Sequence, residues 1–172
     1  ALPQKGHTRP GEILFGTDSH TCMAGAFNQF ATGIGNTDAG FVMGTGKLLI
    51  KVPATMRFRL EGKLQPGVMA KDIILHVIGE IGFDGATYRA MQFDGPGVAS
   101  LSMDDRMTIA NMAIEAVGKN GIFQFDARTA EYVDARVKKN GTKSTYEPVE
   151  PDSDQSFAYE TVVDLDKLEP TV

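Results

Sequence analysis

Side chains able to move a proton are concentrated in residues 16–22, which read GTDSHTC and follow a short apolar run. The apolar run predicts a strand, and in open α/β sheets ligands bind where strands end. Asp18 and His20 form a carboxylate–imidazole pair suited to proton transfer, and the Ser19 hydroxyl can donate to an anion. The same residue types, Thr21 included, also cap helices. The spacing alone therefore leaves a catalytic site and a helix cap open as interpretations.

A second candidate site lies on the helix predicted over residues 102–117, where Asn111 and Glu115 are four positions apart. At that spacing both side chains lie on one helix face and can address one ligand. The alternative is an ordinary solvated face. The other histidines are expected at the surface, His76 on the polar face of a helix and His7 in a loop. One cysteine and three scattered histidines give no zinc-type spacing.

Composition and charge exclude several classes of protein. The 172-residue chain carries a net charge of −5, which disfavours nucleic acid as the main partner. No apolar run reaches the roughly 18 residues that a membrane-spanning helix needs. The single cysteine, Cys22, rules out an internal disulfide framework and fits a reducing compartment, which we take to be the cytoplasm. The chain has no initiator methionine, and we expect it to be an internal fragment of a longer protein.

Hydrophobic periodicity predicts alternating strands and helices. The predicted strands cover residues 12–16, 55–64, 87–93, 122–125 and 158–165. The predicted helices cover residues 23–31, 38–50, 71–81, 102–117 and 128–138. Thr37 is expected to be the N-cap of the second helix, and Ser102 that of the fourth, with Asp105 completing a capping box. This order of elements predicts an α/β fold, with three α/β/α layers and a mainly parallel sheet.

Three segments together resemble the aconitase superfamily. They are GTDSHTC at 16–22, AGAFNQFATGIGNTDAGFVMGTGK at 24–47 and NMAIEAVGKNGIF at 111–123. Within the superfamily the chain is most similar to the large subunits of isopropylmalate dehydratases, since Cys22 and Met23 follow DSHT where aconitases usually have Pro-Asn. The resemblance implies the fold of an iron–sulfur domain. It also implies a hydro-lyase that isomerises 2- and 3-isopropylmalate by dehydration and rehydration, in leucine biosynthesis.

The resemblance also implies a role for each candidate residue. In that family a [4Fe–4S] cluster acts as a Lewis acid on the substrate. Asp18, His20 and Glu115 would be catalytic residues beside the cluster, where they hold its solvent and assist proton movement. Ser19 and Asn111 would bind the substrate.

The family's three cluster cysteines have no counterpart in this chain, and Cys22 matches a position that is not a ligand. We therefore expect no metal ligand here, a cluster held by the rest of the parent protein, and no activity of the fragment alone. The resemblance implies a small-subunit partner with a swivelling domain and a small hydroxy-acid substrate. Homoaconitase or another aconitase-type hydratase is an alternative, and so is a cluster-free carboxylate-binding or regulatory module.

The sequence pattern changes after Pro53, where apolar and charged residues begin to alternate, and this change sets the expected domain boundary. Residues 1–53 would be the C-terminal part of a first aconitase-like α/β domain, and residues 54–172 a second one. Residues 142–154 are rich in proline, serine and acidic side chains, which predicts a mobile connection within the second domain.

Overall fold

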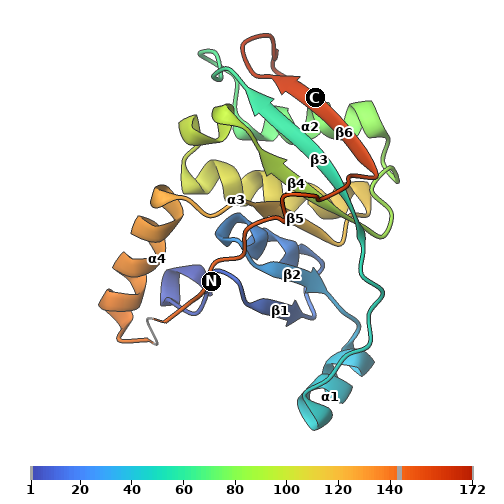
Figure 1. Cartoon of the computed structure of the whole chain (residues 1–172), viewed down its shortest axis with the longest axis vertical. Coiled ribbons are helices and arrows are strands. Elements are labelled where there is room, and N and C mark those ends of the chain that lie inside the picture. The colour runs from blue at the N-terminus through green and yellow to red at the C-terminus, as the bar shows by residue number, and fades with distance from the viewer. Residues whose placement is uncertain (1, 143–144, 172) are drawn as a thin grey trace.

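The structure is a computed structural model that describes residues 2–142 and 145–171, and within them six strands form two sheets (Figure 1). The strands are β1 (Ile13–Gly16), β2 (Phe30–Gly33), β3 (Ala54–Glu61), β4 (Arg89–Asp94), β5 (Asn120–Phe123) and β6 (Tyr159–Asp164). The α-helices are α1 (Asn36–Thr45), α2 (Ala70–Ile81), α3 (Met103–Asn111) and α4 (Ala127–Asn140). The 3-10 helices are η1 (Pro3–Lys5), η2 (Ser19–Phe27), η3 (Pro96–Ser100) and η4 (Met112–Ala116).

Both sheets are parallel. β1 pairs with β2, and the larger sheet has the strand order β5-β4-β3-β6. Parallel neighbours need crossover connections, and helices supply most of them here. The predicted α/β class with mainly parallel sheets is confirmed.

The core lies between the larger sheet and its helices. Met56, Phe58 and Leu60 of β3 are buried, as their alternation with charged residues predicts. Phe58, Phe93 and Phe123 stack in a row across β3, β4 and β5, with ring centroids 5.4 and 5.3 Å apart. Helices α2 and α3 pack behind this row (Figure 1). The sheet is thereby fixed against the helix that leads into the second candidate site.

The helix predicted over residues 23–31 is wrong in both type and extent. The 3-10 helix η2 begins before the predicted helix and ends at Phe27, and the last two predicted residues, Phe30 and Ala31, belong to strand β2. Asn28 ends η2 in a left-handed conformation, with φ of 60°. Its side-chain amide donates to the carbonyl oxygens of Phe123 and Val149, 95 and 121 residues away. Local periodicity carries no information about such distant partners.

Two other predicted helices have different ends. Helix α1 has Gly35 rather than Thr37 as its N-cap, and it stops at Thr45 because Gly46 is left-handed with φ of 68°. The helix predicted over 102–117 is α3 followed by the tighter η4, and the predicted capping box at its start is present.

Helix α2 has nearly the predicted bounds, and His76 on it is exposed as predicted. Asp72, in the first turn of the same helix, is buried although it is charged. Its carboxylate accepts hydrogen bonds from the backbone N–H groups of Met69 and Thr171, which compensate for the lost water.

The predicted domain boundary falls between the small and the large sheet, and it stays a prediction. Residues 143 and 144 of the predicted mobile connection lie outside the described residues. On either side of them, Thr142 Oγ1 donates to the Gly6 carbonyl and the Val149 N–H donates to Asn28 Oδ1. In the described ranges, no helix has the length and apolar character needed to span a membrane.

Candidate functional site

The first candidate segment turns sharply out of β1 into η2. Gly16 ends β1, and a Cβ there would collide with the Thr21 side chain, so the turn requires glycine. Asp18 is the N-cap of η2, and its Oδ1 accepts from the His20 N–H at 2.8 Å. The capping interpretation thus describes Asp18 correctly. The cap also places Ser19 and His20 in the first turn of the helix.

The second candidate segment spans the junction of α3 and η4. Asn111 is the last residue of α3, and Glu115 lies in η4. η4 ends at Val117, which has a left-handed conformation with φ of 61°, and the chain then enters β5.

The fold brings the two segments together at His20 and Glu115, which are 95 residues apart in sequence. His20 Nε2 lies 3.2 Å from Glu115 Oε1, and His20 Nδ1 lies 3.2 Å from Ser19 Oγ and 3.9 Å from Asp18 Oδ1. With Glu115 ionised, Nε2 carries the proton and Nδ1 accepts from the Ser19 hydroxyl. A carboxylate-oriented imidazole with a hydroxyl on its other nitrogen is suited to proton transfer.

Cys22 links the same two segments. Its thiol is buried and donates to the Asn111 carbonyl, with the sulfur 3.3 Å from the oxygen. Burial raises the pKa of the Cys22 thiol to about 11. Since a thiolate is the form that binds metals, this cysteine is a packing residue. No group of three or more metal-ligating side chains occurs among residues 2–142 and 145–171, so the described chain does not fit an iron–sulfur cluster as a set of ligands.

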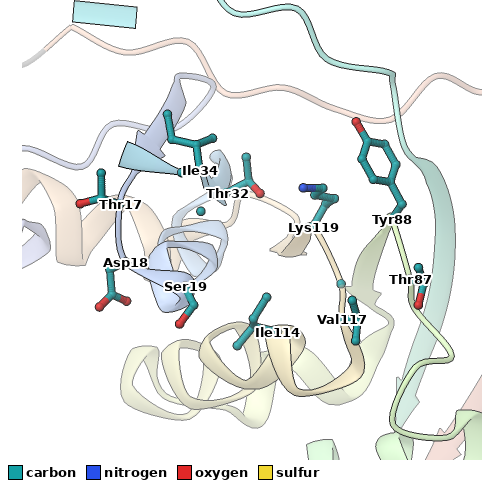
Figure 2. A pocket seen from close by; sticks show the side chains of 13 residues that line it. Thr17, Asp18, Ser19, Thr32, Ile34, Thr87, Tyr88, Ile114, Val117 and Lys119 are labelled. Atoms are coloured by element: carbon teal, nitrogen blue, oxygen red, sulfur yellow. The ribbon is translucent and has the colours of Figure 1, made fainter. Parts of the chain in front are cut away.

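A cavity of about 380 Å³ opens beside the two segments. Thr17, Asp18 and Ser19 line one side, and Tyr88 and Lys119 lie across from them (Figure 2). The complete lining is Thr17, Asp18, Ser19, Thr32, Gly33, Ile34, Gly35, Thr87, Tyr88, Ile114, Val117, Gly118 and Lys119.

Sequence reasoning missed the far wall of this cavity. Tyr88 and Lys119 directly precede β4 and β5, so they lie at the amino ends of their strands. The rule that ligands bind at carboxyl ends directs attention to the opposite edge. The sequence signal for this wall is weak, since only a lysine just before a predicted strand marks it.

Two residues of that wall have strained backbones. Tyr88 has φ of 54° and Val117 has φ of 61°, a region that L-residues other than asparagine and aspartate rarely enter. For a β-branched residue such as Val117 this is a true outlier, with a cost of roughly 1–2 kcal/mol. Strain of this kind collects at functional sites.

We expect Val117→Gly to stabilise the chain by roughly 0.5–1.5 kcal/mol, because relief of the left-handed strain exceeds the added chain entropy of glycine. Val117 is 45% exposed, so little packing is lost. The free energy of unfolding in urea measures the effect. Val162→Gly is the matched control, since that valine is 54% exposed on β6, and it should destabilise. Equal destabilisation by both changes would contradict the strain argument.

Comparison with known proteins identifies the family of this chain. A model of the aconitase family (aconitate hydratase) matches residues 1–172. The chain is 58% identical to the 3-isopropylmalate dehydratase large subunit, chloroplastic, of Arabidopsis thaliana over 172 residues, which are 100% of this chain and 33% of that protein. It is 50% identical to the 3-isopropylmalate dehydratase large subunit of Clostridium kluyveri over 99% of this chain and 40% of that protein.

The 2,3-dimethylmalate dehydratase large subunit of Eubacterium barkeri is also 50% identical, again over 99% of this chain and 40% of that protein. The chain therefore spans a third to two fifths of the length of these curated relatives. Since the family match covers every residue, the chain belongs to the aconitase family.

Proposed function

We propose that the chain is the part of a 3-isopropylmalate dehydratase large subunit that supplies acid–base groups to a hydro-lyase reaction. The observation that carries the proposal is the contact of His20 Nε2 with Glu115 Oε1 at 3.2 Å. It joins the two segments that were singled out separately for their chemistry. Loss and re-addition of water across a carbon–carbon bond require a proton to leave and return, which an oriented imidazole can assist.

Each candidate residue has a proposed task. His20 moves the proton through Nδ1. Glu115 orients the imidazole ring and balances the positive charge that the ring carries when it is protonated. The Ser19 hydroxyl, which donates to His20 Nδ1 in the free site, would turn its one proton to a substrate carboxylate on binding and so leave Nδ1 free. Asp18 holds the turn through the His20 N–H and keeps its carboxylate near Nδ1. Asn111 offers its amide to the substrate from the end of α3.

The proposed cofactor of the whole protein is the [4Fe–4S] cluster that the family resemblance implies. The described residues do not form a ligand set for it, and Cys22 is buried as a thiol. We therefore assign the cluster ligands to other parts of the longer protein. The name "large subunit" of the relatives supports a partner subunit, which we propose is a small subunit with a swivelling domain. The cytoplasm is the proposed location.

A second substrate has support from one relative. The Eubacterium barkeri protein is named for 2,3-dimethylmalate and is as similar to this chain as the Clostridium kluyveri protein is. Both candidate substrates are malates with alkyl substituents. The cavity offers aliphatic side chains for such groups, among them Ile34 and Ile114.

The test is an assay of the complete large subunit assembled with its small subunit and loaded with iron and sulfide. We expect interconversion of 2- and 3-isopropylmalate, with 2,3-dimethylmalate turned over at least about ten times less efficiently, since one small alkyl group changes transition-state binding by that order. If 2,3-dimethylmalate were turned over more efficiently than 2-isopropylmalate, it would become the proposed substrate. No turnover of either compound by a fully loaded enzyme would refute the hydro-lyase assignment.

A further inference from the structure

Among the described residues that line the cavity beside the candidate site, Lys119 is the one with a positively charged side chain. It is half-buried, and its Nζ lies 4.8 Å from the centroid of the Tyr88 ring. Among the ion pairs formed by the described residues 2–142 and 145–171, none involves Lys119. Its charge is therefore balanced in part by the face of an aromatic ring, and its N–H donors are left for a ligand.

The structure holds this lysine in place from several directions. The Lys119 N–H donates to the Arg89 carbonyl at 2.8 Å, which fixes the start of β5 against the start of β4. The Tyr88 hydroxyl accepts from the Lys51 N–H at 3.2 Å, so the ring beneath the ammonium group is anchored at its far end. Tyr88 and Val117, on either side of Lys119 in the wall, both have left-handed backbones. The surrounding fold therefore holds this wall in place in spite of the backbone strain at two of its residues.

Apart from the Asp18 carboxylate, the rest of the lining suits an anion with an aliphatic part. Hydroxyl groups come from Ser19, Thr32 and Thr87, and Figure 2 shows Ser19 across the cavity from Lys119. Ile34 and Ile114 add aliphatic surface. A volume of about 380 Å³ is within the range of small-molecule sites. Because the chain has a net charge of −5, a dianionic ligand needs a local cation, and this cavity provides one.

We propose that Lys119, positioned by the ring of Tyr88, binds a carboxylate of an alkyl-substituted malate and so determines its affinity. The proposal rests on the proposed function for the identity of the substrate. It adds a binding residue across the cavity from Ser19, whose hydroxyl lies 3.2 Å from His20 Nδ1. Lys119 holds the substrate equally in the ground and transition states, so its removal acts on KM and leaves kcat nearly unchanged.

The experiment compares Lys119→Met and Lys119→Arg in the assembled, cluster-loaded enzyme. We expect Lys119→Met to raise KM for 2-isopropylmalate at least about tenfold with kcat within about threefold, whereas Lys119→Arg keeps the charge and recovers most of the affinity. Lys138→Met, at an exposed lysine of α4, is the matched control and should change neither constant. A purely structural role would lower kcat and thermal stability together, and arginine would not rescue it.

Calorimetric titration with 2-isopropylmalate in a His20→Gln background measures binding without turnover. The dissociation constant should rise at least about tenfold on addition of Lys119→Met. The proposal would be overturned if Lys119→Met left both KM and the dissociation constant within twofold of the values measured without this substitution. It would also be overturned if Lys119→Met lowered kcat and left KM unchanged. If the enzyme turns over neither malate but the titration still depends on Lys119, the hydro-lyase assignment fails and the carboxylate site stands.

Discussion

Replacing His20 by glutamine is expected to lower kcat of the complete dehydratase by about 10²- to 10⁴-fold, the usual contribution of a positioned acid–base group. Glutamine keeps a polar side chain of similar reach but cannot take up and return a proton. Glu115→Gln is expected to lower kcat by about 10- to 100-fold, because a carboxylate that orients an imidazole contributes on that scale. Steady-state rates of isopropylmalate interconversion at matched iron content measure both effects.

The loss of activity should be separable from unfolding. The side chains of His20 and Glu115 are 42% and 52% exposed, so the contact between them stabilises the fold by less than about 1 kcal/mol. The variants should therefore melt within a few degrees of the parent chain. His76→Gln, on the exposed face of α2, is the matched control and should leave turnover unchanged.

Non-additivity provides the sharper test of this pair. If Glu115 acts through His20, the double variant His20→Gln/Glu115→Gln should be no slower than His20→Gln alone. Multiplied effects would mean that the two side chains act independently. Near-normal turnover of His20→Gln would refute the proton-transfer role outright.

Local patterns predict the elements that local forces determine. Apolar side chains recur at helical spacing in α2 and alternate in β3, and both elements have nearly the predicted bounds. Local patterns do not predict β2, because Phe30–Gly33 becomes a strand only by pairing with β1. The end of η2 at Asn28 likewise depends on the carbonyls of Phe123 and Val149. Tertiary partners decide these two elements, and a periodicity window does not contain them.

The candidate site likewise has residues that the sequence identifies and contacts that only the fold creates. Residue type and spacing were enough to single out Asp18, His20 and Glu115 for their chemistry. The contact between His20 and Glu115 is a property of the fold, since η2 must pack against α3 and η4 before the two side chains can meet. Lys119 has no sequence signal beyond its position shortly before a predicted strand, and Tyr88 falls inside the strand predicted over residues 87–93. Only the cavity identifies these two residues.

The ion pair of the buried Arg106 with the half-buried Asp126 is a point where one substitution should strongly affect the fold. Arg106 on α3 is fully buried, and its two terminal nitrogens donate to the two carboxylate oxygens of Asp126 at 2.9 and 2.6 Å. The guanidinium also donates to Thr129 Oγ1 and to the Val98 carbonyl. Asp126 is the N-cap of α4. One pair thus joins α3, η3 and the start of α4.

Asp126→Asn is expected to destabilise the chain by about 3–5 kcal/mol, because it leaves a buried cation without its counter-charge. Asparagine is as good an N-cap as aspartate, so the helix cap is retained and the charge alone is tested. The free energy of unfolding in urea measures the loss. Adding Arg106→Met to this variant should restore part of the stability, since the stranded charge is then removed. Destabilisation by less than about 1 kcal/mol would show that solvent reaches the guanidinium and screens it.

The pH dependence of stability tests the same pair without relying on one substitution. Burial would raise the pKa of Asp126, but the Arg106 guanidinium and the Thr129 N–H outweigh it and hold the pKa below its ordinary value. The carboxylate therefore contributes stability that is fully present above its unfolded pKa of about 3.9 and is lost as the pH falls through the lower folded value. Asp126→Asn has no such carboxylate, so the stability gap between parent and variant should be constant from pH 7 to about pH 5 and should narrow below about pH 4. A gap that stayed constant down to pH 3 would mean that the charge of Asp126 does not stabilise the fold, and the role of the pair would then reduce to packing and the helix cap.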